Sequence, residues 1–192
     1  MKRSLGQILY GYVFIFLAIR IGVDILADPI GYCLIAAGCY KIGEVIEDGS
    51  KAAYISIGLI FISIPSVFID FNLVDNGPWH YYANFLFAGE IVLTFYLFRM
   101  LMKLAAENGE MGLFNRTQRL FNIYIPINLL MFGLSAVMIA FVNESLHILA
   151  LLLIIVLLML NIAFIFLLIA FRKAVKDEKP LTFELGEGSK EN

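Results

Sequence analysis

Charged residues are scarce in this chain. They make up 16% of its 192 residues, against roughly a quarter of an ordinary soluble domain. Hydrophobic residues reach 61%, and the mean hydropathy is +0.87. A soluble fold of this length cannot hide so much apolar surface. The composition therefore predicts an all-α integral membrane protein, a polytopic transmembrane helix bundle.

Residues that carry chemistry are also few. The two cysteines, Cys33 and Cys39, would be separated by roughly 9 Å of rise on one helix and point to different faces, too far for a disulfide. His80 and His147 fall near the expected outer surface, but nothing sets them at metal-ligand spacing. The chain has no H-E-x-x-H, G-x-S-x-G or G-x-x-x-x-G-K motif. We expect no enzyme, no cofactor and no metal, and the net charge of −2 does not suggest nucleic-acid binding.

What the sequence has instead is a series of long apolar runs. A membrane-crossing helix needs about 20 such residues, and polar or Gly- and Pro-containing breaks separate the runs. Pro65 and Pro126 should kink their helices. We expect one bundle domain over residues 1–171, a mobile charged tail over 172–192, and an amphipathic surface segment over 105–119. The expected helices cover residues 8–26, 29–45, 52–69, 79–104, 120–142 and 146–171.

The basic residues are distributed very unevenly along these helices. Thirteen of the 14 Lys and Arg residues fall in the segments that a six-helix topology with an internal N-terminus places inside. The exception, Arg20, lies within the first helix. Because positively charged loops stay cytoplasmic, both termini are predicted to be cytoplasmic. A cleaved signal peptide ending at Ala27 is the weaker alternative, since Arg20 and Asp24 make a poor cleavage region.

The turn between the first two helices carries the clearest local signal. Asp28 followed by Pro29 predicts an N-cap with proline in the first turn, so these helices should form a tight hairpin. The segment Asp24–Ile35, DILADPIGYCLI, resembles the D-I-L-P-D-x-I-G-Y-x-L-I pattern of uncharacterised small multi-pass membrane proteins of Gram-positive bacteria, with Ala27 in place of proline. The resemblance implies a bacterial plasma-membrane protein and brings no known activity with it.

Glu90 is the residue for which placement inside a membrane helix costs the most free energy. It lies about 11 residues into its expected helix, or roughly 16 Å, near the middle of a ~30 Å hydrocarbon core. An ionised carboxylate there costs at least about 2.5–3.5 kcal/mol, so it should be protonated, paired or in contact with water. Two interpretations stay open: a proton- or cation-handling carboxylate, and a packing residue hydrogen-bonded between helices.

Arg20 and Asp24 are four residues apart on the first helix, so they face one side and can pair. The alternatives for Arg20 are an anion-binding group, a partner for Glu90, or a side chain that reaches the outer headgroups. Asn161 and Asn128 are expected to bridge neighbouring helices, with substrate binding as the alternative.

Tyrosines are expected mainly in the aromatic belts at the membrane surfaces. Tyr12 and Tyr124 should lie near the inner interface, and Tyr32 near the outer one.

Two classes of function compete on this evidence. A small transporter or channel component would use Glu90, Arg20, Asp24 and Asn161 in a polar pathway. An accessory, regulatory or envelope-stress membrane protein would instead bind a partner through residues 105–119 and the tail. Besides the lipid bilayer, the expected partner is a second copy of the chain or another membrane protein. The water accessibility of Glu90 separates the two classes.

Overall fold

The computed structural model describes residues 1–21, 27–67, 78–140 and 144–175. These residues form an all-helical structure without strands. The elements are α1 (Lys2–Ile21), α2 (Ala27–Gly43), α3 (Glu47–Ser63), the 3-10 helix η1 (Ile64–Val67), α4 (Pro78–Glu107), α5 (Met111–Ala140) and α6 (Glu144–Ala174). The prediction of a bundle of six helices is confirmed.

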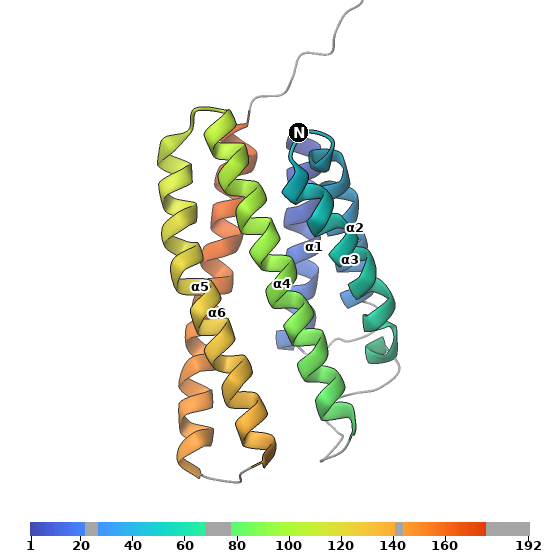
Figure 1. The fold of residues 1–192 in the computed structure, drawn as a ribbon, viewed down its shortest axis with the longest axis vertical. Helices are drawn as coiled ribbons and strands as arrows, with labels where there is room; N and C mark the ends of the chain where they lie inside the picture. The colour runs from blue at the N-terminus through green and yellow to red at the C-terminus, as the bar shows by residue number, and fades with distance from the viewer. Residues whose placement is uncertain (22–26, 68–77, 141–143, 176–192) are drawn as a thin grey trace, which may run out of the picture.

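By chain order the six helices divide into two halves of three, and α4 runs diagonally between α3 and α5 (Figure 1). The first half consists of α1, α2 and α3, each packed on its neighbour in the chain, and the second half of α4, α5 and α6. The halves meet where α3 contacts α4 and where α6 contacts α1. We refer to this boundary as the seam.

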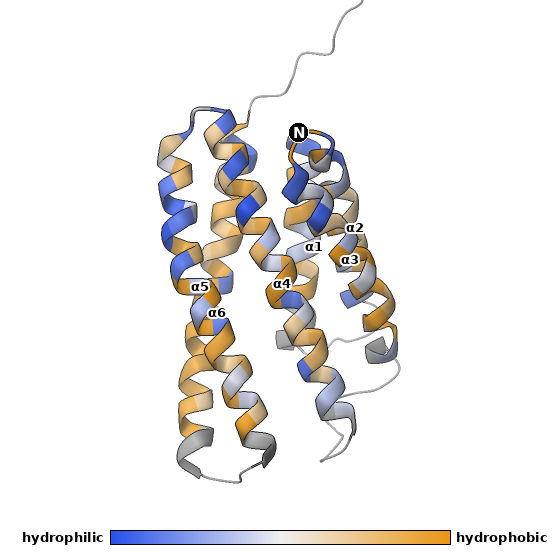
Figure 2. Cartoon of the chain, in the orientation of Figure 1, coloured by the Kyte–Doolittle hydropathy of each residue, from blue (hydrophilic) through white to orange (hydrophobic). Residues whose placement is uncertain are grey.

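One end of the bundle collects the basic residues. The N-terminus, the α2–α3 turn, the α4–α5 turn and the C-terminal end of α6 all lie there (Figure 1), and hydrophilic residues are concentrated towards it (Figure 2). Arg20 is near the opposite end, in the last turn of α1. We refer to the end that holds the N-terminus and the α4–α5 turn as the basic end. By their positions in the helices, the described basic residues near it are Lys2, Arg3, Lys41, Lys51, Arg99, Lys103, Arg116, Arg119, Arg172 and Lys173.

Glycines bring the helices of the first half into close contact. A Cβ atom on Gly11 of α1 would lie 2.5 Å from the Gly31 carbonyl oxygen of α2, and one on Gly38 would lie 2.6 Å from the Ser4 carbonyl oxygen. A Cβ atom on Gly43 would lie 2.6 Å from the backbone nitrogen of Ser50, at the α2–α3 turn. Small residues that let backbones approach are typical of helix packing in membranes, where no hydrophobic effect drives helices together.

The second half consists of longer and more apolar helices. In the described part of the chain, three segments are long and apolar enough to cross a membrane: Tyr81–Glu107, Met111–Val137 and Ile148–Ala174. Much of their apolar surface faces outwards, and Leu151 of α6 is 60% exposed and Leu130 of α5 is 57% exposed. An apolar surface of this extent is not typical of a protein surrounded by water.

Several helix ends differ from their predicted positions. α1 begins at Lys2, before the apolar run, because helical hydrogen bonding continues through the polar residues that precede the run. α3 begins at Glu47, inside the predicted polar break, and its first turn holds Glu47 and Asp48, where acidic side chains interact favourably with the helix dipole. Pro65 lies in η1, so it follows the end of α3 instead of kinking it. Pro126 lies inside α5 as predicted.

The prediction of a separate surface segment over residues 105–119 is wrong. α4 continues to Glu107 and α5 begins at Met111, so the chain reverses within three residues. Gly109 makes this turn possible, because its φ of 72° lies in the left-handed region that favours glycine. Residues 111–119 are therefore the first turns of a long helix. The predicted tail over 172–192 falls, from residue 176 onwards, outside the described residues.

Candidate functional site

Glu90 lies in the middle part of α4 and has a hydrogen-bond partner on α2. The Tyr32 hydroxyl donates to Glu90 Oε1 over 2.6 Å. Tyr32 is fully buried, and Glu90 is partly buried. α2 and α4 belong to different halves of the bundle, so this hydrogen bond crosses the seam.

A second hydrogen-bonded group joins α1 to α5 and α6. The Tyr12 hydroxyl lies 2.9 Å from the Tyr124 hydroxyl and donates to Asn161 Oδ1 over 2.5 Å. Tyr124 donates to the same oxygen over 2.8 Å. The Asn161 amide nitrogen donates to the Leu157 carbonyl oxygen, which fixes Oδ1 towards the tyrosines. The three oxygen atoms thus form a triangle across the seam.

The triangle and the Tyr32–Glu90 pair lie close together in the bundle interior. Glu90 interacts electrostatically with the hydroxyls of both Tyr12 and Tyr124. Thr94, one turn after Glu90, is buried beside the Tyr124 hydroxyl. We refer to Tyr12, Tyr32, Glu90, Tyr124 and Asn161 as the polar cluster; its members come from α1, α2, α4, α5 and α6.

An aromatic layer covers the polar cluster on the side of the basic end. Phe98 follows Glu90 by two turns on α4, and Phe164 follows Asn161 by one turn on α6. Both side chains are fully buried, and their ring centroids are 4.7 Å apart. Phe164 also packs edge-on against Tyr12, with centroids 4.7 Å apart. Two buried aromatic rings thus lie between the polar cluster and the basic end.

The triangle of Tyr12, Tyr124 and Asn161 has fewer hydroxyl protons than oxygen–oxygen contacts. The triangle has three oxygen–oxygen contacts of 2.5–2.9 Å but only two hydroxyl protons, because the Asn161 carbonyl oxygen can only accept. The protons therefore have more than one arrangement over the same contacts. A carboxylate with hydroxyl neighbours and this freedom of proton placement is suited to accepting and passing on a proton.

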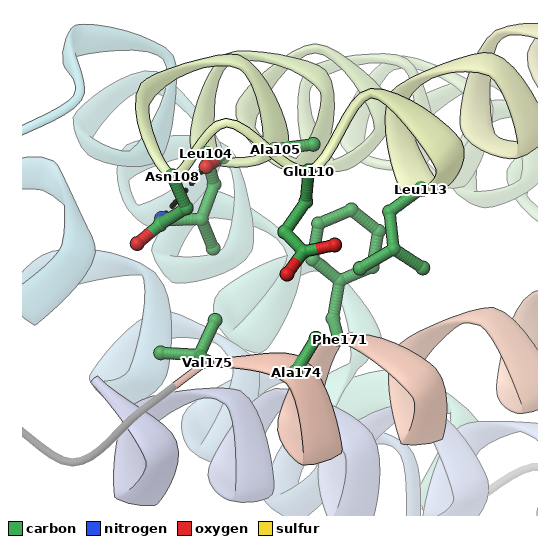
Figure 3. Close-up of a pocket in the computed structure, with 8 residues that line it drawn as sticks. All are labelled: Leu104, Ala105, Asn108, Glu110, Leu113, Phe171, Ala174 and Val175. Atoms are coloured by element: carbon green, nitrogen blue, oxygen red, sulfur yellow. Dashed lines mark hydrogen bonds between the residues drawn. The ribbon is translucent and has the colours of Figure 1, made fainter.

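A cavity of about 180 Å³ opens at the basic end, between the α4–α5 turn and the end of α6 (Figure 3). Leu104, Leu113 and Phe171 form apolar walls, and Asn108 and Glu110 are its polar lining residues. The aromatic layer lies between this cavity and the polar cluster in the helix order. The cavity is thus a feature of the bundle end and is not part of the cluster.

The structure places only some of the predicted site residues in the polar cluster. Glu90 and Asn161 both belong to the polar cluster. Arg20 lies in the last turn of α1, but its side chain and the whole of Asp24 lie outside the described residues, so their predicted ion pair stays a prediction.

At the hairpin, Asp28 and Pro29 both lie in the first turn of α2, which begins one residue earlier than Asp28. Asp28 is therefore inside the helix and not ahead of it as the predicted N-cap requires. It is also one turn from Tyr32 and interacts electrostatically with Glu90.

The buried tyrosines of the polar cluster were not predicted from the sequence. Tyr12, Tyr32 and Tyr124 were expected in the membrane-surface belts, but all three are buried in the bundle. Tyr10 and Tyr54, by contrast, are 54% and 70% exposed. For Tyr12 a signal was present, because it shares a helical face with the core residues Leu5, Ile8 and Leu9. Asn161 does bridge helices as predicted, whereas the Asn128 amide donates to the Tyr124 carbonyl oxygen of its own helix.

Among the described residues, no group of three or more His, Cys, Asp or Glu side chains is placed to hold a metal ion. Cys33 is exposed and Cys39 is buried, and neither forms a disulfide. Comparison of the chain with protein-family models, with curated proteins and with solved structures gives no match.

Proposed function

We propose that this chain is a multi-pass protein of the bacterial plasma membrane and acts as a small transporter or channel component that uses Glu90 as a mid-membrane carboxylate. The observation that carries the proposal is the polar cluster, in which four helices each contribute a polar side chain close to Glu90, the acidic residue that the fifth helix, α4, contributes. Polar groups are expensive inside a bilayer, and where they gather they mark pathways for ions and protons.

The membrane part of the proposal is supported by the second half of the bundle. α4, α5 and α6 have 30, 30 and 31 residues, and a 30-residue helix is about 45 Å long, more than the ~30 Å hydrocarbon core. Glu90 lies about 18 Å from the first residue of α4 and about 26 Å from its last, which agrees with a position well inside the core. The basic end is assigned to the cytoplasm by the positive-inside rule, so both termini are cytoplasmic.

The mechanism we propose is proton transfer through the polar cluster. As a carboxylate, Glu90 accepts the hydrogen bond of the Tyr32 hydroxyl. It binds a proton delivered by water from one side of the membrane and releases that proton to water on the other side. The triangle of Tyr12, Tyr124 and Asn161 extends the set of oxygen atoms across the seam. A displacement of the two halves relative to each other would separate the Tyr12 ring of α1 from the Phe164 ring of α6 and admit water to Glu90.

The test is proton flux in liposomes that contain the purified chain and an entrapped pH-sensitive dye. With a membrane potential imposed by potassium and valinomycin, the wild type should acidify the lumen faster than protein-free liposomes. Glu90→Gln should lower the rate to the protein-free level, because it keeps the shape but cannot bind or release a proton. Ser135→Ala is the control, since it removes a hydrogen bond of 2.5 Å to Asn84 between α4 and α5, outside the polar cluster.

One observation favours the second candidate, an accessory or regulatory protein that acts through a partner. The Glu90 carboxyl group and the Asn161 amide group each already have a hydrogen-bond partner inside the bundle, as structural polar residues do. In addition, the first turns of α5 expose Arg116, Gln118 and Arg119 at the basic end. Wild-type flux equal to that of protein-free liposomes, with the variants folded, would favour this candidate over transport.

A further inference from the structure

A second group of charged residues lies on the seam, near the basic end. The Asp48 side chain in the first turn of α3 is only 1% exposed. Lys103 of α4 contacts its carboxylate over 2.7 Å and Arg99 over 3.5 Å. On α3, Lys51 pairs with Glu47 over 2.8 Å. We refer to these five residues as the seam charge cluster.

The seam charge cluster has one more cation than it has acids. Lys51 and, more weakly, Lys103 lower the pKa of Glu47, and the hydrogen bond and charge of Glu47 raise the pKa of Lys51, so both remain charged. The Asp48 carboxylate is covered, whereas the side chains of Lys51, Arg99 and Lys103 are 45–47% exposed and that of Glu47 is 74% exposed, so the outer face carries three cations and one acid. The outer face of the cluster is therefore cationic.

Two apolar stripes lead up to this cationic face. On α4, Phe85 and Val92 are exposed on the side that continues into Arg99, at spacings of seven residues. On α3, Phe61 and Tyr54 are 68% and 70% exposed on the side that continues to Lys51. α3 and α4 pack against each other across the seam, and Asp48 joins them through Arg99 and Lys103, so both stripes lead to the seam charge cluster.

We propose that this face binds an anionic phospholipid, with its phosphate at Lys51, Arg99 and Lys103 and its acyl chains along the stripes of α3 and α4. Cationic side chains between membrane helices on the cytoplasmic side recognise anionic headgroups, and guanidinium groups suit phosphate geometry. The apolar stripes assign the phosphate to a lipid and not to a soluble anion. The inference rests on the membrane insertion proposed above, but it is independent of any role of Glu90.

The experiment measures phosphatidylglycerol and phosphatidylcholine retained by the purified full-length chain in native mass spectrometry. The wild type should retain phosphatidylglycerol preferentially. Asp48→Asn adds one net positive charge to the face and should strengthen this preference about fivefold, the effect of about 1 kcal/mol per charge near an anionic phosphate. The combined variant Asp48→Asn, Arg99→Gln, Lys103→Gln leaves no buried ion unpaired, and it should weaken the preference by a similar factor.

Arg116→Gln is the matched control, because it changes the net charge by the same amount as the combined variant at an exposed position on α5. It should leave the preference unchanged, and an equal loss in this control would overturn the site in favour of general surface charge. No loss in the combined variant, with its helical content intact, would also overturn it. Displacement of phosphatidylglycerol by excess inorganic phosphate would reassign the face to a soluble anion. Glu90→Gln should retain the lipid even if proton flux fails, which separates this inference from the proposed function.

Discussion

Gly11→Ala should separate α1 from α2 and destabilise the bundle. The added Cβ would lie 2.5 Å from the Gly31 carbonyl oxygen and 3.0 Å from the Ile35 backbone nitrogen. Backbone atoms cannot rotate away as a flexible side chain does, so the helices must move apart by roughly 1 Å to restore ordinary contact. Overpacking of this kind destabilises a fold by about 1–3 kcal/mol. The higher helix propensity of alanine offsets only about 0.5–1 kcal/mol of this loss. The net effect should be a loss of up to about 2.5 kcal/mol.

The matched control is Gly58→Ala on α3, where a Cβ would meet nothing within 4 Å. Here the helix propensity acts alone, so this variant should be neutral or slightly more stable. The assay is thermal unfolding of the purified chain in detergent, followed by the loss of the monodisperse peak in size-exclusion chromatography. A transition temperature for Gly11→Ala at or above that of Gly58→Ala would refute the close approach of α1 and α2.

Two further predictions follow from the polar cluster and from the basic end. Tyr12→Phe removes the hydroxyl that contacts both Tyr124 and Asn161, so the same assay should show a loss of stability of about 1–2 kcal/mol. The control Tyr10→Phe, at an exposed position, should show almost no loss. Equal losses in the two variants would contradict the buried network. In a cysteine-free background, a cysteine introduced at Asn76 should react with an impermeant maleimide added to intact cells, and one at Gly109 should not; external labelling at Gly109 would contradict the cytoplasmic assignment of the basic end.

The helices themselves were largely predictable, because each contains an apolar run with a polar break on either side. Their ends were not, since hydropathy does not register where backbone hydrogen bonding stops. The polar break predicted between residues 45 and 52 includes Glu47 and Asp48, yet both lie in the first turn of α3, where acidic residues are favourable. Gly109 lies in a stretch rich in polar residues, and only its left-handed conformation shows that the chain reverses there at once.

The candidate site was predictable only at Glu90 and Asn161, where the cost of a polar group in a bilayer is itself the signal. A tyrosine gives no such signal, since its ring and hydroxyl suit the membrane interface and the buried core equally well. Its partner depends on how the helices are placed against each other in three dimensions. Tyr32 and Glu90 lie 58 residues apart, and no local pattern connects them.

The two ways in which this bundle is held together have different consequences for its tolerance of substitution. Within the first half, α1 and α2 are specified by shape, because Gly11, Gly31 and Gly38 leave no volume for a side chain. Across the seam, the hydrogen bonds and ion pairs are specified by direction and charge. In a saturation-mutagenesis library, the glycine positions should therefore reject every enlargement regardless of polarity. At Tyr32, by contrast, even Tyr32→Phe should be rejected, because it keeps almost the whole volume but removes the hydrogen-bond donor to Glu90, so selection on this chain acts on size in one region and on chemistry in the other.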